Sequence, residues 1–265
     1  MNKTNKFKFG KNWKLFLKGL ENKHIQISKK ALLKFNQNIN LKNRSFIDIG
    51  SGSGLSSLAA KQLGAKVVSI DVDTECIECT KFLKNKFYKD SKDWDIKKLS
   101  ILNTKNIKIM NKFDYVYSWG VLHHTGNLKK ALKNTESLCG KNGFIHLALY
   151  NDQGRKSKRW KIIKKMYIKN NFIVKKLIEL IFFPFFLLKP FLQSLLSPIL
   201  KNNNRIRKRG MTHYISMVDW LGGYPFETSK PEEIFNFFTN KNYTLISLYT
   251  CGPGHGCNEF LFKKN

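Results

Sequence analysis

The stretch that decides the fold is F-I-D-I-G-S-G-S-G at Phe46–Gly54, an apolar run that leads into a loop with glycine at alternate positions. Glycine is needed where the backbone turns tightly, or where another group must approach it without a Cβ in the way. A helical pattern follows over residues 55–64, and a second apolar run, V-V-S-I-D, ends in Asp71. This strand–loop–helix–strand unit is typical of a Rossmann-like α/β domain.

From this unit onward, short apolar runs alternate with helical patterns, which predicts a parallel sheet covered by helices on both faces. The predicted strands are residues 46–49, 66–70, 96–99, 115–118 and 144–150, with two more at 243–250 and 259–262. The predicted helices are residues 55–64, 74–87, 128–138 and 231–240. The fold class is therefore α/β.

The chain of 265 residues, 42% of them hydrophobic, is long enough for one α/β domain with an insertion. We interpret residues 1–44 as an N-terminal helical arm, basic over residues 1–14, and residues 45–150 as the cofactor-binding core. The strand–helix alternation stops over residues 151–230, which we interpret as an insertion or substrate lid. Residues 231–265 complete the sheet with a helix and two strands.

The formal net charge of +30 is the outlying property of the composition. Such a charge attracts phosphate-rich partners, either nucleic acid or anionic lipid headgroups. A purely compositional origin stays open, because the lysines are scattered along the chain. The five cysteines and the absence of an apolar leader predict a cytoplasmic protein. We interpret the C-x-x-C of Cys76 and Cys79 as packing thiols and predict no metal site.

The glycine loop and Asp71 predict a cofactor with a ribose, because a carboxylate at the end of the second strand can accept hydrogen bonds from two hydroxyls. The loop is G-S-G-S-G rather than the G-x-G-x-x-G of NAD-binding domains. Asp48, just before it, opposes a pyrophosphate but suits the ammonium group of S-adenosylmethionine. The sequence therefore favours S-adenosylmethionine over NAD, with a structural turn as the remaining alternative.

These motifs, together with F-D-Y-V-Y-S-W-G-V-L-H-H at residues 113–124, resemble the successive motifs of class I S-adenosylmethionine-dependent methyltransferases. F-K-F-G-K-N-W at residues 7–13, D-W-L-G-G-Y-P-F-E at 219–227 and G-C-N-E-F at 256–260 resemble a bacterial subgroup labelled as ubiquinone or polyprenyl-benzoquinol methylases. The resemblance implies a Rossmann-like seven-stranded sheet with an antiparallel last strand, and an adenine contact near residues 100–102. The acidic residue common there is absent. The cofactor site expected from motifs and resemblance comprises Asp48, Gly50, Ser51, Gly52, Gly54, Asp71, Ser100, Ile101, Ser118, Trp119 and Gly120.

The reacting end of the site is expected just after the fourth strand, where His123 and His124 follow Ser118-Trp119-Gly120. A histidine that titrates near neutrality is the usual general base for methyl transfer to oxygen. Related enzymes more often carry Glu-His here, and His-His lowers the expectation of a metal. We predict a catalytic role for at least one histidine, with His123 favoured because it takes the position of the family acid. The alternative is that both only cap or support the next helix.

Polar and aromatic side chains in the loops near the insertion predict an acceptor pocket. The predicted substrate-binding residues are Asn151, Asp152, Trp220, Tyr224, Glu227 and Asn258. The alternative, equally favoured, is that they form a scaffold of loop hydrogen bonds around the turn at residues 222–225.

Within the insertion, Leu177–Leu200 is an apolar stretch flanked by basic residues. Its length would allow a membrane span, but a single crossing would separate the last two strands from their sheet, and three prolines interrupt the run. An amphipathic segment that lies on an anionic membrane surface fits better. The alternatives are a lid packed on its own domain or a contact with a second subunit.

These observations predict an enzyme that methylates an oxygen of a small or lipid-linked acceptor, such as a quinone precursor or a glycolipid. An RNA methyltransferase is the main alternative, suggested by the charge, although the sequence has no recognisable RNA-binding module. A protein that binds S-adenosylmethionine without catalysis is a third.

Overall fold

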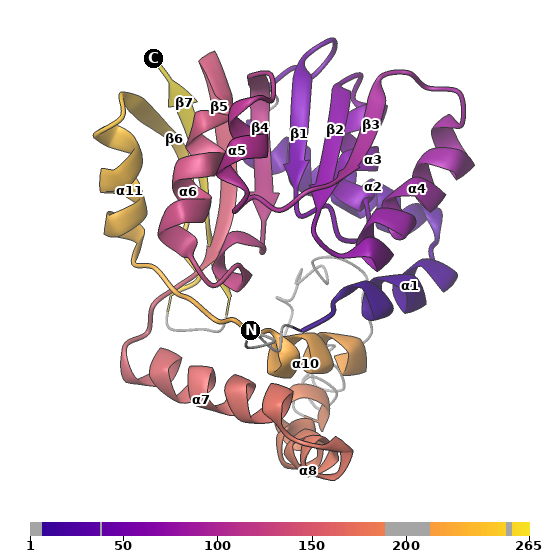
Figure 1. The fold of residues 1–265 in the computed structure, drawn as a ribbon, viewed down its shortest axis with the longest axis vertical. Coiled ribbons are helices and arrows are strands. Elements are labelled where there is room, and N and C mark those ends of the chain that lie inside the picture. The colour runs from indigo at the N-terminus through magenta and orange to yellow at the C-terminus, as the bar shows by residue number, and fades with distance from the viewer. Residues whose placement is uncertain (1–6, 38, 189–212, 253–255) are drawn as a thin grey trace, which may run out of the picture.

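The computed structural model describes residues 7–37, 39–188, 213–252 and 256–265. Within them, seven strands form one sheet in the order β3-β2-β1-β4-β5-β7-β6 (Figure 1). The strands are β1 (Ser45–Ile49), β2 (Lys66–Asp71), β3 (Trp94–Lys98), β4 (Phe113–Trp119), β5 (Cys139–Tyr150), β6 (Tyr243–Tyr249) and β7 (Cys257–Lys264). Strand β7 runs antiparallel between β5 and β6. The predicted α/β fold with a late antiparallel strand is confirmed.

The register of the central strands brings the predicted cofactor residues to one edge. Ile47 of β1 pairs with Val68 of β2 on one side and with Val116 of β4 on the other, all in parallel. The carboxyl ends of these three strands therefore lie together. In an open α/β sheet, this edge at the point where the strand order reverses is where ligands bind.

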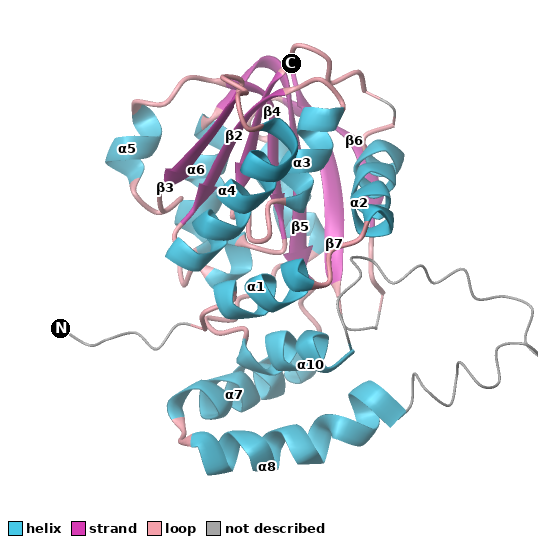
Figure 2. Cartoon of the chain, turned by 90° about the vertical axis from the view of Figure 1, so that its right-hand side faces the viewer, coloured by secondary structure: helices cyan, strands magenta, loops and turns pink. Residues whose placement is uncertain are grey.

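Helices cover both faces of the sheet, as Figure 2 shows for one of them. One face carries α5 (Thr104–Lys108), α6 (Leu128–Ser137) and α11 (Pro231–Thr239); the other carries α2 (Asn22–Phe35), α3 (Leu55–Gln62) and α4 (Thr74–Tyr88). Their inward side chains are fully buried, for example Phe238 on the first face and Leu58 on the second. Burial on both faces explains why the strands are almost continuously apolar.

The insertion forms a helical layer beneath the carboxyl edge of the sheet (Figures 1 and 2). It consists of α7 (Arg155–Lys169), α8 (Phe172–Phe183), a π-helical turn at Pro184–Leu188, and α10 (His213–Gly222). Pro184 follows α8 directly, as expected for a residue that removes a backbone donor. The remainder of Leu177–Leu200 beyond Leu188, and the basic cluster at residues 205–209, lie outside the described residues.

The N-terminal helical arm interpreted over residues 1–44 contains two helices among the described residues, α1 (Gly10–Lys18) and α2, and the first begins within the basic stretch of residues 1–14. Phe16 and Leu17 of α1 are buried in the same apolar cluster as α2, α3 and α4. The lysines of α1 are exposed, so its first turn has the composition of a basic arm although it belongs to an amphipathic helix. The short helix α5 was not predicted, since one turn gives too little periodicity to recognise.

Candidate functional site

The glycine loop after β1 is shaped by close contacts with other parts of the protein. Gly50, Gly52 and Gly54 have positive φ angles of 76°, 55° and 82°. A Cβ at Gly50 would collide with the side chain of Val121, and one at Gly54 would lie 2.8 Å from the Cα of Thr80. The sequence interpretation assigned the glycines to tight turning and ligand approach. In the structure, the missing side chains of these glycines also leave space for neighbouring protein groups.

Asp71 ends β2 beside this loop and is buried. Its carboxylate accepts hydrogen bonds from the backbone N–H groups of Gly52 (3.0 Å) and Asp73 (2.9 Å). Burial raises the pKa of Asp71, and hydrogen bonds from backbone N–H groups, those of Asp73 and Gly52 foremost, act in the opposite direction. A carboxylate has about four lone-pair sites and can accept from ribose hydroxyls as well. This acceptor beside the glycine loop therefore fits the predicted cofactor.

Asp48 lies on β1 but is turned toward α3. It accepts a 2.6 Å hydrogen bond from Ser57, which also bonds Ser69 at 2.7 Å, and the Trp94 indole donates to Ser69. This buried chain of hydrogen bonds holds the helix after the loop against the first two strands. A contact between Asp48 and the ammonium of the cofactor stays a prediction.

The other predicted cofactor residues lie along the same edge. Ser118 ties β4 to β1 through a 3.1 Å bond from its hydroxyl to the Ile49 carbonyl, and Ser51 bonds the Thr80 hydroxyl at 3.0 Å. Trp119 packs on the apolar cluster of the α2–α4 face, and the Gly120 N–H donates to Ala148. In the loop after β3, Ser100 accepts from the N–H of Leu102, while the Ile101 carbonyl accepts from Asn134. Contacts with the cofactor stay predictions for each of them.

His123 belongs to a 3₁₀ turn (Leu122–His124) and is fully buried. Its ring stacks on Tyr150 with centroids 3.8 Å apart, and its Nδ1 accepts the Tyr150 backbone N–H at 3.2 Å. Burial lowers the pKa of His123 well below its usual value, and the charges of His124 and Lys164 add to this. The neutral ring therefore carries its proton on Nε2, a buried atom with no partner among the described residues.

His124 has the opposite tautomer. Its Nδ1–H donates to the Pro225 carbonyl at 2.8 Å, so its Nε2 is unprotonated. Burial lowers the pKa of His124 to about 3, and the Pro225 carbonyl offsets this only in part. The expectation that these histidines titrate near neutrality is wrong for this arrangement. The reason is desolvation, which a sequence does not display.

Lys164 is a site residue that the sequence analysis missed. Of the basic residues in α7, all of which the structure describes, only Lys164 is buried. Its Nζ donates to the Trp220 carbonyl and lies 4.1 Å from the Trp220 ring centroid. Burial lowers the pKa of Lys164 to about 7, which Asp219 partly opposes. Helical spacing could have found it, since Trp160, Lys164 and Tyr167 share the inward face of α7.

Comparisons with known proteins agree with this geometry. Residues 22–182, more than half of the chain, match the model of a methyltransferase domain family. The chain belongs to this methyltransferase family. The predicted family, and S-adenosylmethionine as its cofactor, are thereby confirmed.

Individual relatives cover only part of the methyltransferase or resemble it in fold alone. A curated ubiquinone biosynthesis O-methyltransferase from Pelagibacter ubique (strain HTCC1062) is 34% identical over 113 residues, which are 42% of this chain and 44% of that protein. Ribosomal protein L11 methyltransferase from Legionella pneumophila (strain Paris) is 54% identical over 41 residues, 15% of this chain and 14% of that one. The chain thus matches less than half the length of these curated relatives.

Solved structures of low sequence identity share the fold of the methyltransferase. Magnesium protoporphyrin IX methyltransferase from Synechocystis PCC 6803, with bound SAH, aligns with a TM-score of 0.54 at 12% identity, covering 91% of this chain and 84% of that one. A putative S-adenosylmethionine-dependent methyltransferase from Listeria monocytogenes aligns with a TM-score of 0.52 at 11% identity, covering 90% and 98%.

Four of the six predicted substrate-binding residues make side-chain hydrogen bonds to other parts of the protein. Glu227 accepts from the N–H groups of Gly126 and Leu128 at the start of α6, both at 3.0 Å. The Asn258 amide donates to Asn151 at 3.1 Å, and Asp152 accepts the N–H of Gly154, the residue just before α7, at 2.9 Å. These contacts favour the scaffold alternative, and acceptor binding by them stays a prediction.

Trp220 and Tyr224 are placed differently. The Trp220 ring lies against Tyr150 and Trp160, with centroids 5.3 and 5.4 Å away, and these three residues line a small pocket at the end of β5. Tyr224 precedes a cis proline, Pro225, whose carbonyl holds His124. Their contact with an acceptor also stays a prediction.

The cysteines and acidic residues form no metal cluster in the described ranges. No group of three or more His, Cys, Asp or Glu side chains there is arranged to hold a metal ion. Cys76 and Cys79 are buried free thiols, and burial raises the pKa of both. Both therefore behave as packing residues.

Proposed function

We propose that the protein transfers a methyl group from S-adenosylmethionine to an oxygen of a small or lipid-linked acceptor, such as a quinone precursor or a glycolipid. The observation that carries this proposal is the buried Asp71 carboxylate, bonded to the glycine loop at 3.0 Å and lying on the same sheet edge as the histidine pair. The name of the Pelagibacter relative supports oxygen as the methylated atom.

S-adenosylmethionine would supply a methyl group activated on a positively charged sulfur. Asp71 would hold the ribose, and the ends of β1 and β4 would position the reacting end. The Nε2–H of His123 is buried, so it would donate a hydrogen bond to the acceptor oxygen only after the side chains around it move aside. The unprotonated Nε2 of His124 would act as a hydrogen-bond acceptor, because its pKa of about 3 makes it a weak base at neutral pH. Most of the rate would come from holding the acceptor oxygen in line and excluding water.

The direct test is to supply methyl-labelled S-adenosylmethionine with lipid extract, small metabolites and tRNA in separate reactions. We expect label in the lipid or small-molecule fraction. Label in tRNA would replace this proposal with the RNA methyltransferase. Binding of S-adenosylhomocysteine (SAH) without label in any fraction would favour a binding protein without catalysis.

Asp71→Ala is expected to weaken SAH binding by about 1.5–3 kcal/mol, the range for hydrogen bonds to a charged group. Isothermal titration calorimetry measures this as a roughly 10- to 150-fold higher Kd. Asp95→Ala is the control, because Asp95 lies on the edge strand β3 and pairs with Lys97 at the surface. Unchanged affinity in a folded Asp71→Ala protein would remove Asp71 from the cofactor site.

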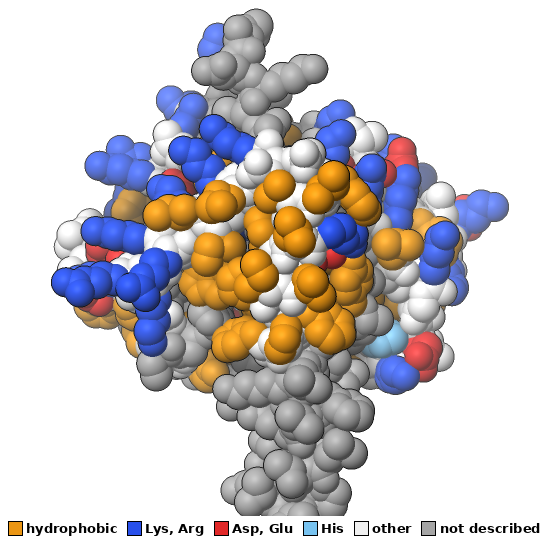
Figure 3. Space-filling view, turned by 90° about the horizontal axis from the view of Figure 1, so that it is seen from below, with side chains coloured by type: hydrophobic (Ala, Val, Ile, Leu, Met, Phe, Trp, Pro, Cys, Tyr) orange, Lys and Arg blue, Asp and Glu red, His pale blue; other side chains and the backbone are white. Residues whose placement is uncertain are grey.

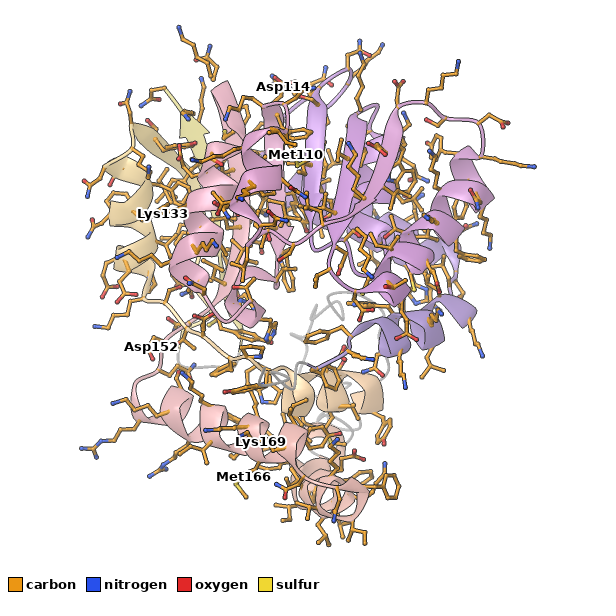
Figure 4. All side chains as sticks on the ribbon, in the orientation of Figure 1. Met110, Asp114, Lys133, Asp152, Met166 and Lys169 are labelled. Carbon is orange, nitrogen blue, oxygen red and sulfur yellow. The ribbon has the colours of Figure 1, made fainter. Side chains whose placement is uncertain are left out.

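We further propose that the outer face of α7 and α8 rests on an anionic membrane surface. Seen from below, apolar side chains gather at its centre, with lysines and arginines at its sides (Figure 3). The exposed apolar residues are Ile162, Met166, Phe172, Ile173, Leu177, Leu180, Ile181, Phe183 and Phe185. Met166 and Lys169 lie together on the last turn of α7 (Figure 4). An apolar centre with a basic rim matches a headgroup surface.

No helix in the described ranges is long and apolar enough to cross a bilayer. Contact would therefore be interfacial, with each inserted Leu or Phe contributing on the order of 1.5–3 kcal/mol and each nearby Lys about 1 kcal/mol. The variant that tests this must avoid Phe182 and Phe186, because both pack on Trp160 beneath the surface.

The double variant Leu180→Ser, Ile181→Ser is expected to abolish sedimentation with liposomes that contain anionic lipid, because both side chains are about 70% exposed and lie on α8. High salt should release most of the unmodified protein, since the basic rim provides the long-range attraction. Ile109→Ser is the control, an 84% exposed residue beyond α5 and away from this face. The unmodified protein could instead fail to bind liposomes and form a dimer that dissociates in the double variant. That result would assign the face to contact with a second copy of the chain.

A further inference from the structure

The segment of residues 7–13 joins the two halves of the candidate site. On one side, the backbone N–H of Phe7 donates to the Tyr224 carbonyl at 3.1 Å, and the Phe7 ring lies against Gly222. On the other, the Gly10 N–H donates to Asp73 at 3.2 Å, two residues beyond Asp71. Figure 1 shows α1 and α10 neighbouring each other beneath the carboxyl edge of the sheet.

Asn12 makes the shortest of these links. Its side-chain amide donates to Asp219 of α10 at 2.6 Å, across 207 positions in the sequence. Burial raises the pKa of Asp219 to about 7, and the Asn12 amide partly opposes this. Residues 7–13 are therefore hydrogen-bonded to the insertion through Phe7 and Asn12, and to the core through Gly10.

Trp13 lies directly over the glycine loop. Its indole Nε1 is 3.0 Å from the position that a Cβ on Gly52 would take, so the absent side chain admits the indole. The ring is partly exposed and meets Phe16 edge to face at 5.9 Å, which anchors it to the core. Among the described residues, the indole N–H has no hydrogen-bond partner. It is thus a free donor, with an aromatic face, at the loop that the cofactor must touch.

Three hydrogen bonds hold residues 7–13 across the site, and each contributes on the order of 1 kcal/mol net. Ring contacts add to them: Phe7 packs on the apolar cluster of the insertion, and the Phe9 ring lies 5.2 Å from His124. Segments with few buried contacts open locally at a lower free energy than the core of a protein. A segment of this kind can admit a ligand and then close on it.

We propose that residues 7–13 form a clasp that closes over bound S-adenosylmethionine. Trp13 would contact the cofactor, and the bond from Asn12 to Asp219 would link cofactor binding to the position of α10. The inference rests on the proposed cofactor site. It goes further by assigning a role to a segment outside the sheet. The aromatic face of Trp13 suits both the cationic sulfonium and the adenine ring of the cofactor. Through Asp219, closure of the clasp would set the insertion over the acceptor.

The test uses SAH and the full-length chain. Trp13→Ala is expected to raise the Kd for SAH roughly 10- to 100-fold by calorimetry, and Trp13→Phe less, since Phe keeps the aromatic face but loses the N–H. Asn12→Leu is expected to raise it about 3- to 10-fold, although the Asn12 amide bonds Asp219 and not the loop. Leu15→Ala is the control, because Leu15 lies on the same helix with its side chain 54% exposed.

Hydrogen–deuterium exchange on the unmodified chain keeps the proposal testable if a variant does not fold. SAH should slow exchange in α1 and in α10 together. Slower exchange confined to the glycine loop would overturn the clasp. Tighter binding of SAH by Trp13→Ala would also overturn it, because Trp13 would then be a plug that the cofactor displaces. If the unmodified chain binds no SAH at all, the proposed function fails instead.

Discussion

Lys164→Met is expected to stabilise the protein by about 2–4 kcal/mol at pH 6.5, because a fully buried ammonium group costs more than the apolar side chain that replaces it. For a chain of this size, the melting temperature should rise by roughly 5–10 °C. Urea unfolding followed by circular dichroism measures the difference. Lys165→Met is the matched control, since the next lysine of α7 is exposed.

The pH dependence of this effect has a defined sign. The pKa of Lys164 falls from about 10.4 in the unfolded chain to about 7 in the folded protein. Between these values the unfolded chain binds a proton that the folded protein does not, so the stability of the unmodified protein rises with pH. The slope from Lys164 is at most ~1.4 kcal/mol per pH unit. Asp219 opposes this rise near pH 7, because its raised pKa of about 7 makes the folded protein bind the extra proton there, and it stops contributing at higher pH, where its carboxyl is ionised in both states.

The advantage of Lys164→Met should therefore shrink as the pH rises from 7 toward 10. The Lys165→Met control corrects for the general relief of positive charge over the same range. A stability gain that does not vary with pH would mean that Lys164 is neutral throughout, and that packing alone explains the gain.

Gly54→Ala is expected to destabilise the protein by about 2–5 kcal/mol and to weaken SAH binding at least 10-fold. The left-handed backbone at Gly54 costs a side chain roughly 1–2 kcal/mol. The new Cβ would also lie 2.8 Å from the Cα of Thr80, and this backbone atom can move only with α4, so overpacking adds about 1–3 kcal/mol. Both values come from urea unfolding and calorimetry.

Gly252→Ala separates the two contributions. Gly252 has a comparable φ of 61°, but a Cβ there would meet nothing within 4 Å in the part of the chain that the structure describes. It should show the backbone cost of roughly 1–2 kcal/mol alone and leave SAH binding unchanged. Equal losses for the two variants would contradict the clash between α3 and α4.

Much of the sheet could be predicted because its signals are local. The apolar run before Gly50 and the run that ends in Asp71 each lie within a few residues, and each predicted strand was found within a few residues of its observed bounds. The side chains that close the site could not be placed in this way. Lys164 is buried because α7 packs on α10; the spacing of Trp160, Lys164 and Tyr167 indicates one face of α7, but the sequence does not show what covers that face.

By itself, the sequence determined the α/β fold, the position of the glycine loop and the placement of Asp71 at the end of β2. These follow from periodicity and spacing, which act between neighbouring residues. Only the tertiary structure decided how the site is protonated and covered. Burial among Tyr150, Trp220 and Phe226 shifts the pKa of Lys164, and the indole of Trp13 fills the place beside Gly52. Desolvation and close approach depend on which distant residues meet, and that is settled when the chain folds.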